Sequence, residues 1–292
     1  DVATLLAVPR FLKHDYVARL LEIALGLAGL GGGRLHAPAV PNLRRVVLLD
    51  DGGAGLPRWD DLPADADAAL LDALDAAVAP TDLATIFFTS GTTAQAKAVV
   101  HAHAVLGALA TLAGGGRVVL QEVVEPAAAL DLLEAERCTI MAGWHQAGPL
   151  LEQPDFARRR LALHKGTYHA QAARLMGPDH RTIGVYGMSE TATCVTAARC
   201  DDPEPIRTGT FGRVLAGMEV RIADPDTRRP LPAGESGEIL VRGSTMMEGY
   251  HRVPRASTFD AEGFFRTGDR GWLDEAGNLH FGGRIKDVIK TA

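Results

Sequence analysis

Between residues 83 and about 187, short apolar runs alternate regularly with alanine- and leucine-rich segments. The apolar runs predict strands at 83–88, 117–121, 138–142 and 182–186. The segments between them predict helices at 99–112, 126–136 and 145–152. Strand and helix alternating at this spacing favour a mostly parallel sheet covered by helices, which is an α/β fold.

After residue 190 the pattern changes to short alternating strands separated by Gly, Pro and Asp turns. The clearest of these strands are "MEVRIAD", "GEILVRG" and "GNLHFGG", which predict a smaller antiparallel β unit. We place the boundary near 205–215, so that residues 1–208 form the α/β part and 209–283 the β-rich subdomain. Before residue 83 we expect a helix at 14–30, a strand at 44–51 and a helix at 65–78.

Composition and charge restrict the possible partners. The net charge of −6, with no Lys/Arg cluster, argues against nucleic acid. The three cysteines show no CxxC pair, which is typical of a reduced compartment. The longest apolar region, 20–33, is short for a membrane span, and no signal peptide is present. A cytoplasmic protein is therefore expected, and because the chain begins at Asp1, not Met, we expect an upstream part.

A loop rich in hydroxyl groups follows the first strand of the alternating region and contains Thr89, Ser90, Gly91, Thr92, Thr93 and Lys97. Backbone N–H groups, hydroxyls and one ammonium group suit a phosphate, although an ordinary polar connection has a similar composition. A Walker loop is disfavoured because Ala96 and Ala98 flank the lysine where glycine and Ser/Thr are required.

Two further segments carry candidate ligand-binding groups. In "YGMSETA" (186–192), Tyr186 is suited to stacking on a base and Glu190 to holding magnesium. Taken alone, however, the segment is better explained by a core tyrosine followed by a helix cap at Ser189 or Thr191. In "GFFRTGDRGWLDEAGN" (263–278), we expect an exposed turn carrying Asp269, which is suited to a ribose diol, whereas Asp274 is assigned to a hairpin turn.

Taken together and in order, these motifs resemble the adenylate-forming superfamily. They are "TSGTT…K…H.H", "YGMSET", "GEI.VRG…M.GY", "TGD.G" and "GR.KD.IK". This family contains acyl- and aryl-CoA synthetases, luciferase and the adenylation domains of nonribosomal peptide synthetases. The resemblance extends from about residue 83 to the last residue, and the hydroxyl-rich loop matches the family's ATP phosphate loop.

The resemblance implies that a carboxylic acid attacks the α-phosphate of ATP, releasing pyrophosphate and giving an acyl-adenylate. The acyl group then passes to a thiol, usually coenzyme A. By the same carry-over, Thr89, Ser90, Gly91, Thr92, Thr93 and Lys97 would bind phosphates. Tyr186 and Gly187 would lie at adenine, Ser189 near the α-phosphate, and Glu190 would hold Mg2+. Asp269 would bind the ribose with help from Arg284. Residues 284–292, with Asp287, would form the hinge to a small C-terminal domain.

Several departures from the family pattern are visible. The loop has Ala94, Ala96 and Ala98 where the family is richer in glycine and proline. The family's C-terminal domain, with its adenylation lysine, would lie beyond Ala292, so we expect the chain to bind nucleotide but to make acyl-adenylate poorly. Candidate residues for the acyl pocket are Trp144, His145, Gly166 and Thr167, although His145 is as well explained by a core or helix-start position.

Three alternatives to a CoA ligase stay open at this point. A second adenylating reaction would load a carrier protein or form an amide. A catalytically weakened nucleotide-binding module is a candidate of another class, and a phosphoryl-transfer enzyme, which would release ADP, is the weakest.

Overall fold

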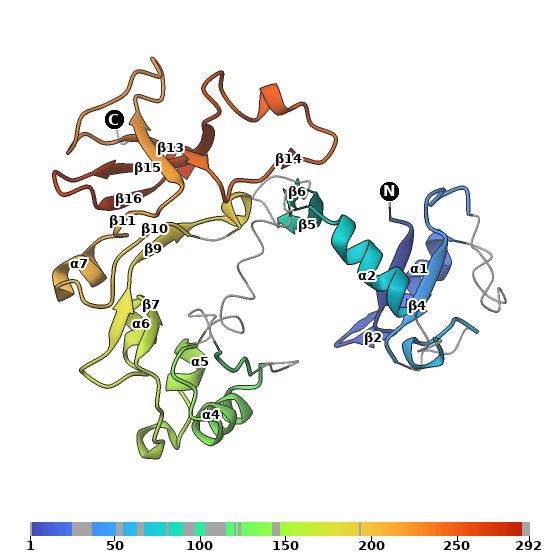
Figure 1. Ribbon diagram of the computed structural model, residues 1–292. Coiled ribbons are helices and arrows are strands. Elements are labelled where there is room, and N and C mark those ends of the chain that lie inside the picture. Colours follow the sequence, from blue (N-terminus) through green and yellow to red (C-terminus); the bar gives the residue numbers. More distant parts are fainter. Residues whose placement is uncertain are drawn as a thin grey trace. The chain divides into compact units, whose positions relative to one another are not determined.

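A computed structural model shows two compact units, residues 1–78 and 79–292, which are described separately (Figure 1). The structure describes residues 2–24, 37–50, 55–62, 67–79, 82–89, 97–102, 115–119, 121, 124–141, 147–192 and 194–287. The predicted α/β class with an antiparallel β part after it is confirmed. The boundary predicted near residue 208 stays a prediction.

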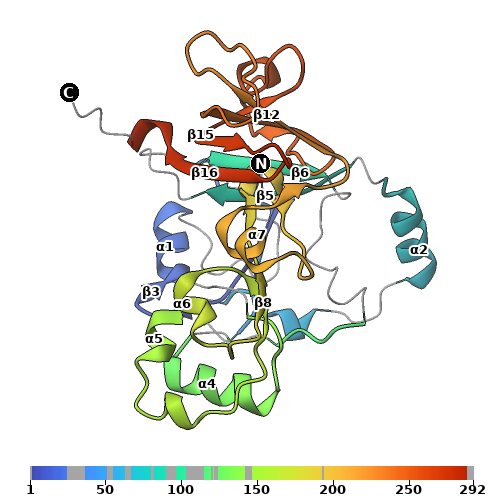
Figure 2. The ribbon, with the colours of Figure 1, turned by 90° about the vertical axis from the view of Figure 1, so that its left-hand side faces the viewer.

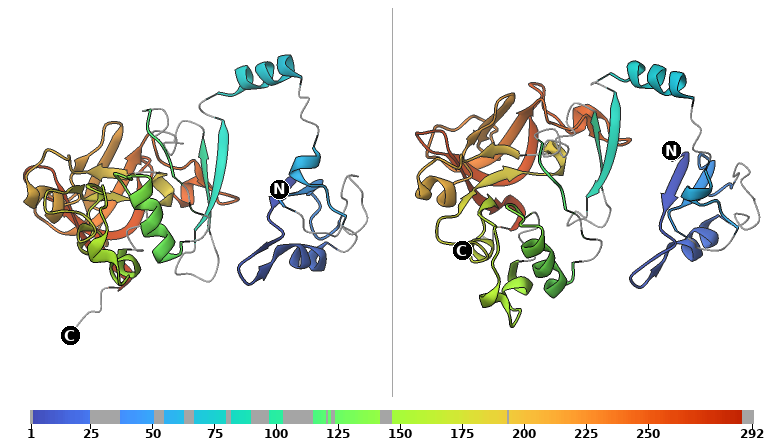
Figure 3. Two further views of the ribbon diagram at one scale, coloured as in Figure 1. Left: turned by 90° about the horizontal axis from the view of Figure 1, so that it is seen from below. Right: turned by 60° about the horizontal axis from the view of Figure 1, so that its bottom comes forward.

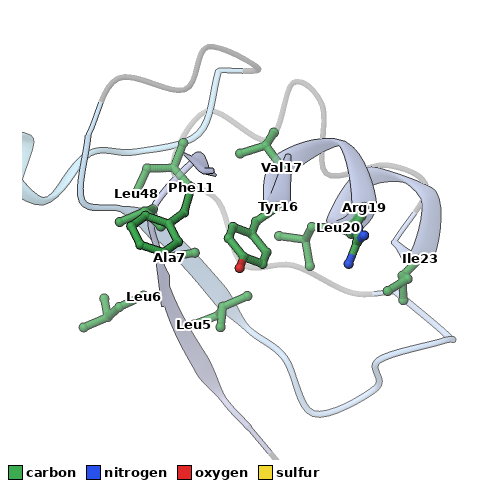
Figure 4. A pocket seen from close by; sticks show the side chains of 11 residues that line it. Leu5, Leu6, Ala7, Phe11, Tyr16, Val17, Arg19, Leu20, Ile23 and Leu48 are labelled. Atoms are coloured by element: carbon green, nitrogen blue, oxygen red, sulfur yellow. The ribbon is translucent and has the colours of Figure 1, made fainter. Parts of the chain in front are cut away.

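The smaller unit pairs two parallel strands beside one helix. Its elements are β1 (Thr4–Ala7), β2 (Arg10–Phe11), β3 (His14–Asp15), α1 (Tyr16–Ile23), β4 (Arg45–Leu48), the 3-10 turn η1 (Trp59–Asp61) and α2 (Ala68–Ala77). Asp15 caps α1 by accepting the Ala18 N–H, so the predicted helix at 14–30 begins at Tyr16 and ends at Ile23. A cavity of about 420 Å³ lies between α1 and β1, with Phe11, Tyr16 and Leu20 gathered at its wall (Figure 4).

The larger unit begins with a three-stranded antiparallel sheet and a group of helices. Its first elements are β5 (Leu83–Thr89), β6 (Lys97–Ala102), α4 (Pro126–Ala135), α5 (Ala147–Leu151), η5 (Phe156–Arg158), β7 (Lys165–Thr167), α6 (Ala170–Ala173), β8 (Arg181–Ile183), β9 (Val185–Gly187), η6 (Ser189–Thr191) and β10 (Cys194–Ala197). Strands β7 and β8 pair in parallel, and α4, α5 and α6 share a core around Leu130, Leu150 and Leu163.

The remaining elements form the predicted antiparallel part. They are α7 (Glu204–Gly209), β11 (Arg213–Val214), β12 (Met218–Ala223), β13 (Gly237–Gly243), β14 (Gly249–Tyr250), η7 (Arg255–Ser257), β15 (Phe265–Leu273), β16 (Leu279–Arg284) and η8 (Ile285–Asp287). A four-stranded sheet has the order β12-β13-β15-β16. Figure 2 shows this sheet at one end of the larger unit and α4, α5 and α6 at the other.

The predicted helix at 99–112 is wrong over its described residues, which belong to strand β6. This strand pairs antiparallel with β5 on one side, where the two teal strands run side by side in Figure 3, and with β14 on the other. Val99 and Val100 are β-branched and buried, and packing of such residues in a sheet overrides the helix propensity of the neighbouring alanines. Residues 103–112 lie outside the described part of the chain.

Two predicted strands are also corrected. Residues 117–119, the start of the strand predicted at 117–121, have no strand pairing, and 138–141 form only a single parallel bridge between Ile140 and Lys165. Both runs are short and flanked by arginine or glutamate, so periodicity alone does not separate them from irregular structure. The predicted strand at 182–186 is confirmed as β8 and β9, and the helix at 126–136 as α4.

One core joins the strand after the predicted phosphate loop to the antiparallel part. Val99 of β6, Val195 of β10 and Ile239 of β13 are each fully buried in it, together with Tyr186. This core therefore positions β6, β9 and β15, the three strands that carry the candidate site residues.

Candidate functional site

Asp269 and Tyr186 form a buried pair in the larger unit. The Tyr186 hydroxyl donates to Asp269 Oδ2 at 2.7 Å, and the two residues are 6% and 3% exposed. Arg284 lies directly opposite Asp269 in the β15–β16 register, and its Nε is 3.0 Å from Asp269 Oδ1. Cross-strand neighbours of opposite charge contact each other in this way because their Cβ atoms are close.

Burial and hydrogen bonding act in opposite directions on these two groups. Burial raises the pKa of Asp269, while the Tyr186 hydroxyl and the Arg284 charge act to lower it. Burial also raises the pKa of Tyr186, so this hydroxyl stays protonated and remains a donor. A carboxylate oxygen can accept two hydrogen bonds, and Asp269 therefore retains capacity for a further donor such as a hydroxyl.

Glu190 lies in the turn η6, which follows β9 immediately. Its Oε1 accepts a hydrogen bond from the Tyr250 hydroxyl at 2.7 Å, and its backbone carbonyl accepts the Met247 N–H at 2.7 Å. The same turn is held from β6, where the fully buried His101 donates through Nε2 to the Ser189 carbonyl at 2.7 Å. The turn ends at Ala192, whose φ of 55° reverses the chain.

Lys97, Glu190 and Arg284 line one cavity of about 310 Å³. The remaining wall comes from the residue before η6, from β14, from η7 and the residue after it, and from β15. It consists of Met188, Tyr250, Ser257, Thr258, Phe265, Arg266 and Thr267. Three cationic side chains and one carboxylate at the same cavity suit an anion that carries a divalent cation. A nucleotide polyphosphate with bound Mg2+ is an anion of this kind.

The structure brings together only some of the residues that the sequence singled out. Tyr186, Glu190, Asp269, Arg284 and Lys97 are connected through contacts or through the shared cavity. Gly187 ends β9 and Ser189 begins η6, next to this group. Gly166 and Thr167 lie in β7 and do not line the cavity.

The other candidate residues are located only in part. Thr89 ends β5, opposite Lys97 in the sheet register, and Asp287 ends η8. Ser90, Gly91, Thr92, Thr93, Trp144 and His145 lie outside the described residues. Their predicted roles in phosphate and acyl binding stay predictions.

Sequence reasoning missed the seven other residues that line this cavity: Met188, Tyr250, Ser257, Thr258, Phe265, Arg266 and Thr267. Tyr250 is part of the "M.GY" motif, so its presence was visible although its contacts with Lys97 and Glu190 were not. Ser257 ends η7 and Thr258 follows it, in a turn-rich segment where no periodicity distinguishes a cavity wall from an ordinary turn.

Glu190 fits a magnesium site of the type that uses one carboxylate and substrate phosphates. Within the described residues, no group of three or more His, Cys, Asp or Glu side chains is placed to hold a metal ion. Mg2+ commonly binds through one or two carboxylates together with phosphate oxygens and water, and needs no larger protein cage. A single carboxylate at a cavity lined by cationic side chains meets this requirement.

The family model for "AMP-binding enzyme" matches this chain over residues 33–113 and 104–251. The chain belongs to this family. As a family member it shares 31% identity with triostin synthetase I of Streptomyces triostinicus over 293 residues, which cover 96% of this chain and 54% of that protein. It is also 31% identical to the 3-[(3aS,4S,7aS)-7a-methyl-1,5-dioxo-octahydro-1H-inden-4-yl]propanoyl:CoA ligase of Rhodococcus jostii (strain RHA1), over 85% of this chain and 56% of the ligase.

A solved structure with the same fold is the ATP-bound MatB from Rhodopseudomonas palustris. It matches with a TM-score of 0.68 and 25% identity, covering 98% of this chain and 60% of MatB. The chain spans about half the length of the curated relatives it matches, triostin synthetase I and the Rhodococcus ligase among them. None of the described helices combines the length and the hydropathy that crossing a bilayer requires.

Proposed function

We propose that this family member activates a small carboxylic acid with ATP, forming an acyl-adenylate and releasing pyrophosphate, and then transfers the acyl group to coenzyme A. The observation that carries the proposal is the meeting of Lys97, Glu190 and Arg284 at one cavity, next to the Tyr186–Asp269 pair. Relatives named as CoA ligases support coenzyme A as the acceptor.

The chemistry requires positive charge at the phosphates, because the incoming carboxylate and the α-phosphate are both negative. In this proposal Lys97 binds phosphate oxygens from the β6 side of the cavity. The bound Mg2+ supplies further neutralisation of phosphate charge, and Glu190 would hold it. Thr89, Ser90, Gly91, Thr92 and Thr93 would add hydroxyl and N–H donors from the loop that precedes Lys97.

Asp269 and Tyr186 would hold the nucleoside. The Asp269 carboxylate accepts from the ribose hydroxyls while Arg284 limits its charge, and the Tyr186 ring packs against the base. Gly187 and Ser189 follow on the same β9–η6 segment and would lie near the adenine and the α-phosphate. The acyl group would occupy the region of Trp144, His145, Gly166 and Thr167, and Asp287 would be a hinge residue.

Two measurements test this proposal. Calorimetry should detect binding of ATP and AMP to the wild-type chain. Glu190→Gln should weaken this binding when Mg2+ is present and leave it unchanged when Mg2+ is absent. A panel of carboxylic acids should then stimulate ATP–pyrophosphate exchange and AMP release. This assay is run with the family's C-terminal domain supplied, because adenylate formation by this chain alone is expected to be poor. ADP as the nucleotide product would refute adenylation, and nucleotide binding without exchange for any acid would favour a binding module.

Comparing acceptors separates the possible second steps. Coenzyme A should increase AMP release and yield a thioester, whose formation is followed by ultraviolet absorbance. Release stimulated by amines or a carrier protein, with coenzyme A inactive, would replace the thioester step by amide formation or carrier loading.

A further inference from the structure

Tyr250 contacts two charged residues of the cavity through different parts of its side chain. Its hydroxyl donates to Glu190 Oε1 at 2.7 Å. Its ring lies under the Lys97 ammonium, with Nζ 4.9 Å from the ring centroid, which is within cation–π range. One aromatic side chain therefore holds both the carboxylate and the ammonium group of the cavity.

The backbone fixes Tyr250 in this position. Tyr250 pairs with Val99 in the β14–β6 register, two residues from Lys97 on the same strand, so both side chains project from the same face of the sheet. Hydrogen bonds on either side of the pair lock the register: the Glu248 N–H donates to the Val100 carbonyl and the His251 N–H to the Ala98 carbonyl, both at 2.8 Å.

The segment before β14 also anchors the turn that carries Glu190. The Met247 N–H donates to the Glu190 carbonyl at 2.7 Å, and Met247 itself is fully buried. The segment that carries Tyr250 thus contacts Glu190 twice, through the Tyr250 side chain and through the Met247 backbone.

The hydroxyl of Tyr250 acts as a neutral donor to the carboxylate. In the 2.7 Å hydrogen bond the phenolic O–H is the donor and Glu190 Oε1 the acceptor. No ion pair between Lys97 and Glu190 occurs among the described residues. The carboxylate therefore keeps its negative charge for a cation, while the ammonium group keeps its charge for an anion.

We propose that Tyr250 is a positioning residue of the nucleotide site, whose hydroxyl orients Glu190 toward the divalent cation and whose ring orients Lys97 toward the phosphates. This assignment rests on the proposed function. It divides the side chain into two separable parts, because phenylalanine retains the ring and loses only the hydroxyl.

The test compares Tyr250→Phe and Tyr250→Leu in binding experiments without turnover. Binding of Mn2+ to the complex with ATP is followed by electron paramagnetic resonance, and binding of ATP without metal by calorimetry. Tyr250→Phe should weaken Mn2+ binding about ten- to a hundredfold, the range for residues that orient a metal ligand, and change metal-free ATP affinity by less than about twofold. Tyr250→Leu should also weaken metal-free ATP binding, by about three- to tenfold.

Tyr168→Phe provides the matched control, since it removes a hydroxyl in the same unit from a tyrosine that does not line the cavity. Wild-type Mn2+ affinity in Tyr250→Phe would overturn the assignment. Equal loss of metal-bound and metal-free binding in Tyr250→Phe would also overturn it, since that result indicates a general disturbance of the fold. If the wild-type chain binds neither ATP nor Mn2+ with ATP, the proposed function fails, and the assignment fails with it.

Discussion

Replacing Asp269 with alanine should destabilise the fold, because the buried Tyr186 hydroxyl would lose its acceptor. Tyr186 is 6% exposed and donates to Asp269 at 2.7 Å. A buried hydroxyl left without its partner costs about 1–3 kcal/mol. The lost contact with Arg284 adds little, because that side chain is 56% exposed and the pair is screened by solvent.

Two effects reduce this cost. Alanine removes a carboxylate whose burial is itself unfavourable, as the raised pKa of Asp269 indicates. The Thr267 hydroxyl also lies near the Tyr186 oxygen, where it acts to lower the pKa of Tyr186 and is a possible alternative acceptor. We therefore expect Asp269→Ala to lower the free energy of unfolding by about 1–2 kcal/mol, measured by urea denaturation at pH 7.

Asp269→Asn is the matched variant, because its amide oxygen still accepts the Tyr186 proton while the buried charge is gone. Its free energy of unfolding should stay within about 0.5 kcal/mol of the wild-type value. The double variant Tyr186→Phe/Asp269→Ala should recover most of the loss, since no hydroxyl is left without an acceptor. Equal destabilisation by alanine and asparagine would refute this reasoning and identify the charge as the main stabilising factor.

Ligand binding separates the two roles of the same residue. Under the proposed function, both Asp269→Ala and Asp269→Asn remove charge-assisted bonds to the ribose, so both should weaken ATP or AMP binding by about 1.5–3 kcal/mol. Unchanged affinity in calorimetry, with the fold intact, would contradict the ribose assignment without affecting the stability argument.

Further variants test the fold and the proposed chemistry. Gly212→Ala should lower the free energy of unfolding by more than about 3 kcal/mol, because a Cβ there would lie 1.9 Å from backbone atoms. Gly277→Ala, also at positive φ but facing open space, should lower it by only about 1–2 kcal/mol in the same urea titration. Burial acts to raise the pKa of Asp274, but hydrogen bonds within the hairpin outweigh burial and hold this pKa below its ordinary value. The stability that Asp274 contributes is therefore present above the ordinary pKa and is lost as the pH falls through the folded-state pKa. Asp274→Ala should flatten the acid limb of a curve of unfolding free energy against pH. Lys97→Ala and Thr92→Ala should slow adenylate formation more than thioester formation from pre-formed acyl-adenylate, and equal slowing of both steps in rapid-quench experiments would contradict a role at the departing pyrophosphate.

The sequence predicted the types of residue at the site better than their contacts. The motifs identified Tyr186, Glu190 and Asp269, because glycine turns and chemically distinctive side chains can be recognised locally. The partner of Glu190 is Tyr250, which is far away in sequence, and the partner of Tyr186 lies on β15. Such hydrogen bonds depend on strand registers that no local pattern encodes.

Errors in the fold have a similar origin. The segment at 97–102 lies beside alanine-rich sequence and contains two valines, so its local pattern suits both helix and strand. Pairing with β5 and β14 decides in favour of strand, and β14 contributes only two residues, too few to be recognised as a strand beforehand. The antiparallel part was predicted more accurately for β12, β13 and β16, which show clear alternation. The exposed turn expected at Asp269 is wrong, because this residue lies buried in strand β15.

The pairing of β6 with β14 also determines when the site can form during synthesis of the protein. Lys97 leaves the ribosome on the order of ten to thirty seconds before Tyr250, at ordinary rates of translation. During that interval the outer edge of β6, with its buried valines, has no strand beside it, and an open edge of this kind is prone to pair with other chains. The cavity that joins Lys97 to Glu190 is therefore completed late, and under the proposed function ATP would stabilise the nascent protein only after β14 has been added.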